Sequence, residues 1–267
     1  MKITSLKNPK IKNALSLREK SGRDKLGLFG VEGAREILRA VESGFKLDEV
    51  FVCEKCLSNE GHQVVTKIED GPSSEKTYEI TAQIFSKLAV RENKDGIFAV
   101  FQKKEFFLKD LKLPPNPLLL IVEGVEKPGN LGALLRSADG AGTHAVIVID
   151  DSVDIYNPNV IRASLGTFFH VPVVQTAKEL ALSFCTKNEI KIFSGSLEAN
   201  QYYYDLNFKQ AAAIILGSEA LGLSDFWIKN SDCLVKIPML GIADSLNLSV
   251  AGAILLYEAC RQRLLPS

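Results

Sequence analysis

The second half of the chain alternates short apolar runs with longer amphipathic stretches. Runs without polar side chains, such as 118–122, are typical of strands that are buried on both faces of a parallel sheet. Apolar positions recur every three or four residues over 131–141, and 248–264 is a long, mostly apolar stretch, so both predict helices. Strand and helix alternation of this kind predicts an α/β domain with a parallel sheet. The expected strands of this half are 118–122, 145–149, 171–174, 190–194 and 212–216.

The first half predicts a smaller α/β domain. Helices are expected over 33–43 and 81–88, and strands over 47–52 and 96–101. Three prolines then fall within 114–117, a density that excludes a helix or a central strand. We therefore expect three segments, namely a domain over 1–106, a linker over 107–117 and the larger α/β domain over 118–267.

Positive charge is concentrated at the start of the chain. Residues 2–25 carry eight basic and two acidic side chains, a local net charge of +6, whereas the whole chain is neutral with 32 of each sign. Nucleic-acid binding depends on such local patches and not on the total charge. The alternative is a solvated face without a partner. The candidate RNA contacts are Lys7, Lys10, Lys12, Arg18, Arg23 and Arg35.

Cysteine usage and hydropathy indicate a cytoplasmic protein. No apolar run approaches the ~18 residues that a membrane helix needs, and the first residues do not resemble a signal peptide. Five scattered cysteines fit a reducing compartment. Cys53 and Cys56 form a lone CxxC with His62 nearby, but a structural zinc site needs about four ligands. We therefore expect no metal and no membrane partner.

The first segment that could carry chemistry is 126–139, which joins a predicted strand to a helix. It contains Asn130 at the helix start and Arg136 beside the apolar face. The alternative interpretation is a capping asparagine and a solvated arginine. A dinucleotide site also competes, because Asp150 follows about twenty residues after the glycine turn. The segment lacks the G-x-G-x-x-G pattern that such a site requires.

Two further segments follow the last predicted strands. In 214–223 a buried strand ends at Gly217 and leads into a short loop with Glu219, which suits a ligand lying against exposed backbone. In 236–249 a short strand stops at a proline, and Ser245 and Asn247 place polar groups in an apolar sequence. A turn with special dihedral angles and a capped helix are the alternatives.

Taken together and in this order, the three segments resemble the motifs of the SpoU/TrmH family of RNA 2′-O-ribose methyltransferases. The matching stretches read GNLGALLRSADGAG, LGSEALG and IPM followed by SLNLS, so this likeness covers residues 118–267. The stretches FGVEGAREIL and GIFAVF resemble the family's substrate-binding domain, which is a small α/β/α module. One departure is Lys127, where many members carry an acidic or amide residue before the Pro-x-Asn of the first motif.

The resemblance implies a trefoil knot in the second domain and S-adenosylmethionine as the cofactor. The cofactor contacts are expected to be Leu216, Gly217, Ile237, Met239 and Leu246. The expected catalytic residues are Arg136, Asn130, Glu219, Ser245 and Asn247. In relatives the arginine comes from a partner subunit, so the expected active unit is a homodimer.

RNA is the expected substrate, rRNA in preference to tRNA, and no DNA partner is implied. Arginine is almost always protonated, so Arg136 is expected to orient the target phosphate and hydroxyl and not to act as a base. Two other functions stay open on the sequence. One is a non-catalytic RNA-binding protein of the same fold, and the other is a nicotinamide-dependent enzyme.

Overall fold

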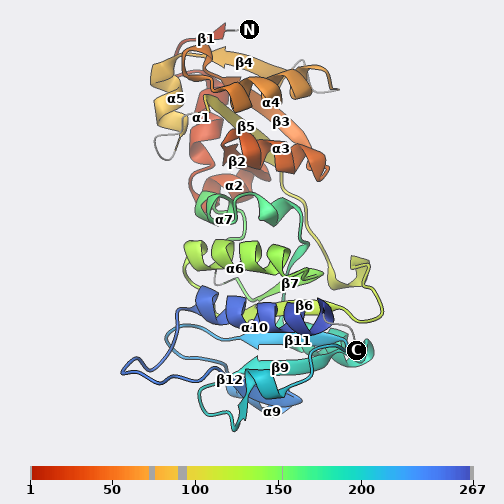
Figure 1. Ribbon diagram of the computed structural model, residues 1–267. Coiled ribbons are helices and arrows are strands. Elements are labelled where there is room, and N and C mark those ends of the chain that lie inside the picture. Colours follow the sequence, from red (N-terminus) through yellow and green to blue (C-terminus); the bar gives the residue numbers. More distant parts are fainter. Residues whose placement is uncertain (1, 72–75, 90–94, 152, 265–267) are drawn as a thin grey trace. The chain divides into compact units, whose positions relative to one another are not determined.

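The computed structural model describes residues 2–71, 76–89, 95–151 and 153–264. Packing divides the chain into two compact units (Figure 1). The first consists of Met1–Lys104 with Tyr156–His170, and the second of Glu105–Ile155 with Val171–Ser267.

The first unit contains a mixed five-stranded sheet in the order β1-β4-β3-β5-β2. The first three of these run parallel, and β5 runs antiparallel to both of its neighbours. The strands are β1 (Lys2–Ile3), β2 (Leu28–Glu32), β3 (Leu47–Val52), β4 (Thr77–Ile80) and β5 (Ile97–Gln102). The helices are α1 (Pro9–Ser16), α2 (Lys20–Leu26), α3 (Ala34–Glu42), α4 (Asn59–Glu69), α5 (Ala82–Leu88) and α7 (Pro158–Ala163), with 3₁₀ helices at Glu54–Cys56 and Thr167–Phe169.

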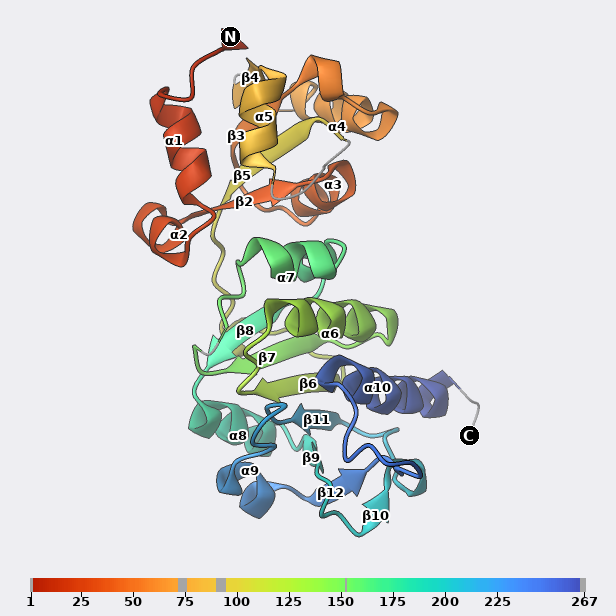
Figure 2. The ribbon, with the colours of Figure 1, turned by 90° about the vertical axis from the view of Figure 1, so that its left-hand side faces the viewer.

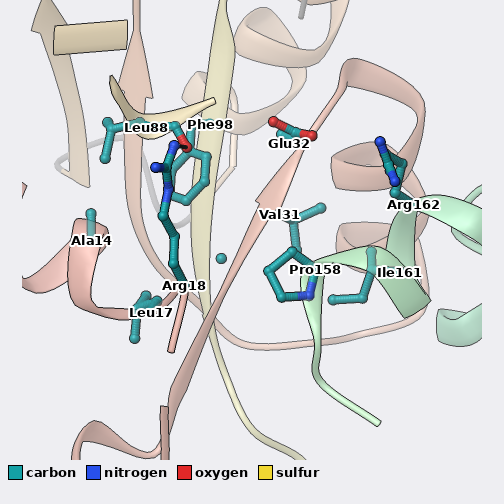
Figure 3. Close-up of a pocket in the computed structure, with 11 residues that line it drawn as sticks. Ala14, Leu17, Arg18, Val31, Glu32, Leu88, Phe98, Pro158, Ile161 and Arg162 are labelled. Atoms are coloured by element: carbon teal, nitrogen blue, oxygen red, sulfur yellow. Dashed lines mark hydrogen bonds between the residues drawn. The ribbon is translucent and has the colours of Figure 1, made fainter. Parts of the chain in front are cut away.

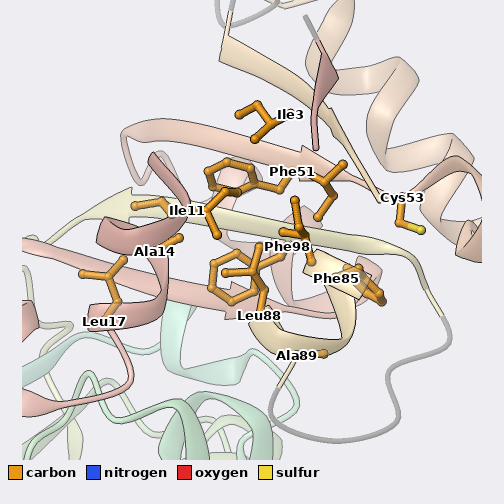
Figure 4. Close-up of a cluster of buried hydrophobic side chains, with 13 residues drawn as sticks. Ile3, Ile11, Ala14, Leu17, Phe51, Cys53, Phe85, Leu88, Ala89 and Phe98 are labelled. Carbon is orange, nitrogen blue, oxygen red and sulfur yellow. The ribbon is translucent and has the colours of Figure 1, made fainter. Parts of the chain in front are cut away.

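The basic N-terminal segment folds into helices whose apolar faces are buried. The N-cap of helix α1 is Asn8, whose side chain accepts a hydrogen bond from the Lys10 N–H at 2.9 Å, and Pro9 occupies the first helical position. Its residue Ile11 and the adjoining Leu17 point into an apolar cluster with side chains of β3, β5 and α5 (Figure 4). The basic side chains of this segment are therefore carried by folded helices and not by a free arm.

Residues 156–170 come from the second half of the sequence but pack within the first unit. Tyr156 and Phe169 lie against Phe29 of β2, with ring centroids 4.7 and 6.2 Å away. The Arg39 guanidinium donates to the Leu165 carbonyl at 2.7 Å. The sequence alone assigns this segment to the domain over 118–267, because periodicity does not reveal which sheet a helix covers. The domain limits otherwise stay a prediction.

The second unit contains a parallel seven-stranded sheet in the order β10-β12-β9-β11-β6-β7-β8. The strands are β6 (Leu118–Glu123), β7 (Ala145–Ile149), β8 (Val173–Thr176), β9 (Lys191–Gly195), β10 (Gln201–Tyr202), β11 (Ala212–Leu216) and β12 (Cys233–Lys236). The helices are α6 (Pro128–Gly140), α8 (Lys178–Lys187), α9 (Asp225–Asn230) and α10 (Leu248–Leu264), with 3₁₀ helices at Leu108–Asp110 and Tyr203–Asp205.

Helices cover both faces of this sheet. Figure 2 shows α6 and α10 side by side on one face, with α8 and α9 on the other. Gly252 allows α10 to approach closely, since a Cβ atom there would lie 2.3 Å from Leu134 Cδ2 of α6 and 2.9 Å from Leu216 Cδ1 of β11. The fully apolar strands are buried as the sequence predicts, because both of their faces are covered.

The expected α/β fold with a parallel sheet and a preceding α/β domain is confirmed. The trefoil knot stays a prediction, since strand order and register say which strands pair and not how the chain threads. Within the described part of the chain, no helix is long and apolar enough to cross a membrane.

Candidate functional site

A cavity of about 420 Å³ lies in the second unit, at the carboxyl ends of β9, β11 and β12. This volume falls within the range of small-molecule sites in proteins. The structure brings all of the expected cofactor contacts to its wall, together with Ser245, and these contacts are Leu216, Gly217, Ile237, Met239 and Leu246. Their role as contacts stays a prediction. Sequence reasoning missed the part of the wall that follows β9, although Gly195 ends that strand as Gly217 follows β11.

The loop after β11 lines this cavity. Ser218 and Gly222 exchange two backbone hydrogen bonds, at 2.9 and 3.0 Å, which close the loop into a tight turn. A Cβ atom on Gly217 would lie 2.1 Å from the Gly222 carbonyl carbon, so no larger residue fits without a shift of the loop. Apolar side chains and backbone groups form most of the wall.

A hydrogen-bonded polar cluster adjoins the cavity. The Glu219 side chain accepts hydrogen bonds from the side-chain amides of Asn130 and of Asn247, the latter at 3.1 Å. Asn247 also donates to Asn130 Oδ1 at 3.3 Å. On the other side of the carboxylate, the Lys127 ammonium lies 2.7 Å from Glu219 Oε2. Residues from the first, second and third motifs therefore meet in one place.

Charge in this cluster is fixed by the pairing of Lys127 with Glu219. The hydrogen bond from Lys127 lowers the pKa of the Glu219 carboxyl below its usual range, and the Asn130 amide adds to this effect. The Glu219 carboxylate raises the pKa of Lys127 in turn. Both groups are consequently ionised at neutral pH.

The two asparagines have different local roles. Asn247 Oδ1 accepts hydrogen bonds from the Ser249 N–H at 3.0 Å and from its hydroxyl at 2.6 Å, so this side chain caps α10 while its amide reaches Glu219. Asn130 lies in the first turn of α6, whose N-cap residue is Lys127. The Asn130 side chain donates to Glu219 in the polar cluster and does not cap α6.

Arg136 and Ser245 lie outside the cluster. Arg136 is exposed on α6, about two helical turns after Asn130, and makes no hydrogen bond or ion pair with any residue that the structure describes. Ser245 is exposed in the loop between β12 and α10 and lines the cavity. Within one chain, Arg136 is therefore free to contact a substrate or a second subunit.

The basic residues named as RNA contacts divide into exposed and engaged ones. Lys7 and Lys12 are exposed, while Lys10 is ion-paired with Glu49. Arg18 donates to the Ala89 carbonyl at 2.7 Å. Arg35 is exposed and pairs with Glu36 at 2.8 Å.

The prediction that Arg23 contacts RNA is wrong. Its side chain is buried, with 1% of its surface exposed, and donates to the Leu17 and Arg18 carbonyls at 2.6 and 2.8 Å. It satisfies backbone groups at the α1–α2 corner and is not available at the surface to an RNA phosphate. A count of basic residues does not distinguish this arginine from its exposed neighbours.

A second hollow lies in the first unit, beside Arg18, Glu32 and Arg162 (Figure 3). Its free volume is about 10 Å³, which is about the room of one water molecule. Arg162 is held by Asn159 Oδ1 at 2.9 Å. This hollow is too small for a nucleotide or a cofactor.

The CxxC pair shows thiols in close contact. The Cys53 and Cys56 sulfur atoms lie 2.8 Å apart, and burial raises the pKa of the Cys53 thiol to about 11. In the described ranges, no three histidine, cysteine or acidic side chains are arranged to hold a metal ion.

Comparison with known proteins connects both units to RNA methylation. The model of the SpoU rRNA Methylase family matches residues 117–257, and that of the MRM3-like substrate binding domain matches residues 8–99. The 23S rRNA (guanosine(2553)-2′-O)-methyltransferase RlmP of Bacillus subtilis (strain 168) is 29% identical over 256 residues, which cover 96% of this chain and 98% of that protein.

Two solved structures resemble the whole chain. The crystal structure of an RNA 2′-O ribose methyltransferase is 39% identical with a TM-score of 0.87, and the match covers 99% of this chain and 100% of that one. The AdoMet-bound rRNA methyltransferase from Sinorhizobium meliloti is 26% identical with a TM-score of 0.89, over 100% and 99% of the two chains. The family model covers more than half of the chain, and these findings confirm the resemblance, so the chain belongs to the SpoU rRNA methylase family.

Proposed function

We propose that the protein transfers a methyl group from S-adenosylmethionine to a ribose 2′-hydroxyl of rRNA. The observation that carries the proposal is the junction of the two sites: the cavity and a hollow beside the polar cluster share Ser218, Glu219, Ala220 and Leu248. A methyl donor in the cavity would therefore lie next to the three-motif cluster. Bound S-adenosylmethionine supplies an activated methyl group. Leu216, Gly217, Ile237, Met239 and Leu246 would hold it, largely by apolar contact and backbone groups.

The residues of the cluster orient the substrate and do not accept its proton. Both oxygen atoms of Glu219 already accept hydrogen bonds, and its lowered pKa makes it a weak base. His144 is engaged elsewhere, because its Nδ1 accepts a hydrogen bond from the Leu118 N–H at 3.1 Å. The proton of the 2′-hydroxyl would then be transferred to a substrate phosphate or to solvent. The planar guanidinium of Arg136 would bind that phosphate through two hydrogen bonds.

The proposal includes a homodimer in which the partner supplies Arg136. Arg136 is exposed and unengaged, and the last helix leaves apolar side chains uncovered, with Val250 46% and Tyr257 51% exposed. A second copy of the chain would cover such a surface and bring an arginine to each site. We expect the exposed basic residues of the first unit to hold the RNA by its phosphates, without reading its sequence.

We favour rRNA over tRNA because two of the three relatives reported above, those of Bacillus subtilis and Sinorhizobium meliloti, are named for rRNA and match almost the whole chain. A cytoplasmic location stays a prediction, as does the absence of a DNA partner. The two alternative functions, a non-catalytic RNA-binding protein and a nicotinamide-dependent enzyme, gain no support from the comparisons.

The test is methyl transfer from labelled S-adenosylmethionine to rRNA, tRNA and DNA. We expect label in rRNA, at a nucleotide where the RNA backbone resists alkaline cleavage, since a methylated 2′-oxygen cannot attack the neighbouring phosphate. The Asn130→Ala variant is the control for contaminating activity. Label on a base, or no transfer with a protein that binds the cofactor, would contradict the proposal.

A further inference from the structure

Lys127 occupies an unusual position for a cation. It is the N-cap residue of α6, and its side chain makes no capping hydrogen bond. Helix N-caps favour Ser, Thr, Asp and Asn, and the positive end of the helix dipole disfavours a nearby cation. The side chain is 71% exposed, so burial of its stem does not explain the choice of lysine. A residue that breaks a local rule in this way points to a function at the site.

The environment of Lys127 is acidic. The hollow beside the polar cluster is lined by two carboxylates, Glu126 and Glu219, and by one cation, Lys127. Glu219 is held on its other side by the amides of Asn130 and Asn247, which are neutral and leave its charge in place. Among the groups that the structure describes around Glu219, the countercharge comes from Lys127.

We propose that Lys127 is a positioning residue that neutralises Glu219, so that this carboxylate can hold the Asn130 and Asn247 amides in a site that admits RNA phosphates. The inference rests on the proposed function, in which a polyanion must approach this hollow. An unneutralised carboxylate there would repel the substrate, whereas removing the carboxylate would release the two amides. The ion pair resolves this conflict.

A double-mutant cycle tests the inference in an RNA-binding assay that does not require methyl transfer. Lys127→Met should weaken binding of an rRNA fragment about tenfold at moderate salt, as expected for one uncompensated charge near a phosphate. Adding Glu219→Gln should restore the affinity, because the repelling charge is gone. It should not restore kcat, since the two asparagine amides would no longer be held by a carboxylate that accepts from both.

Two further variants serve as controls. Lys127→Arg keeps the charge and should retain both RNA affinity and kcat. Lys229→Met removes a lysine whose side chain is 74% exposed and that also pairs with a carboxylate, Asp225 at 3.5 Å. Lys229 lines neither the cavity nor the hollow beside the polar cluster. It should leave RNA binding unchanged. Thermal unfolding and cofactor binding of each variant show that the fold is intact.

Two results would overturn the inference. If Lys127→Met binds RNA as the unmodified protein does, the pair is a solvated surface interaction. If the double variant binds as weakly as Lys127→Met, then Lys127 contacts the RNA itself and does not act through Glu219. Failure of the proposed function is seen separately, as absence of 2′-O-methylation by the unmodified protein.

Discussion

Replacing Gly217 by alanine gives the sharpest test of the cavity. The added Cβ atom would lie 2.1 Å from the Gly222 carbonyl carbon, 2.2 Å from its oxygen and 2.3 Å from the Leu223 nitrogen. Real Cβ atoms essentially never lie within 3.0 Å of a heavy atom beyond their own residue and its chain neighbours, and all three of these atoms belong to the backbone. Gly222 and Leu223 must therefore move away from Gly217 and the adjoining Ser218 by about 0.9 Å, since no side chain can turn away to make room.

The size of the effect follows from the bonds that close this loop. The two hydrogen bonds between Ser218 and Gly222 measure 2.9 and 3.0 Å, and a shift of that size would take both beyond hydrogen-bonding distance. Each such bond contributes about 0.5–1.5 kcal/mol net, so we expect a loss of about 1–3 kcal/mol of stability. The loop also lines the cavity, so the affinity for S-adenosylmethionine should fall by about tenfold or more.

Calorimetry with S-adenosylmethionine and urea unfolding measure the two effects. Gly129→Ala is the matched control, because a Cβ atom there would meet nothing within 4 Å, and alanine favours the first turn of α6. Equal cofactor affinity of the Gly217→Ala and Gly129→Ala variants would refute the reasoning. It would show that the loop is not the wall of the cofactor site.

Two other outcomes are expected. Arg136→Ala should abolish methyl transfer and leave cofactor affinity nearly unchanged, since Arg136 does not line the cavity; transfer near the normal rate would mean that it is a solvated arginine. Burial lowers the pKa of His144, whose Nδ1 accepts from the Leu118 N–H. Stability against urea should therefore be full above the unfolded-state pKa of about 6.5 and decline as the pH falls towards the lower folded-state pKa. His144→Gln should flatten that dependence, and an unchanged pH profile would contradict the assignment.

The strands of the second unit could be predicted from the sequence because both of their faces are buried. The expected strands 145–149 and 212–216 coincide with β7 and β11, and β6 extends the expected run by one residue. The short edge strand β10 was not predictable, since its two residues are exposed and carry no periodicity. Its existence depends on pairing with β12, which is a tertiary contact.

The first unit was predicted less completely, and the reason is physical. In and just after α1, lysines and other polar residues separate the apolar ones, so the segment has the composition of a basic arm while Ile11 and Leu17 are buried. The segment over 156–170 lies within the expected domain over 118–267 but packs in the first unit, because aromatic packing decides its place. Phe168 and Phe169 pack against Phe45, which is far away in the sequence, with ring centroids 6.3 and 5.0 Å apart.

In the candidate site, too, the sequence identifies single residues but not the contacts between them. Asn130, Glu219 and Asn247 could each be named from their motifs, but each also had a local explanation as a cap or a turn residue. What brings the first two of these residues together is the register of two strands: β6 and β11 are parallel neighbours with Val122 opposite Leu216. Glu219 follows the end of β11 by three residues, and Lys127 follows the end of β6 by four, so the two loops leave the sheet together and the ion pair forms between them. Neither motif by itself shows that these two loops are neighbours. For this reason Lys127 is only a departure from the family pattern in the sequence, while the fold shows it as the countercharge of Glu219.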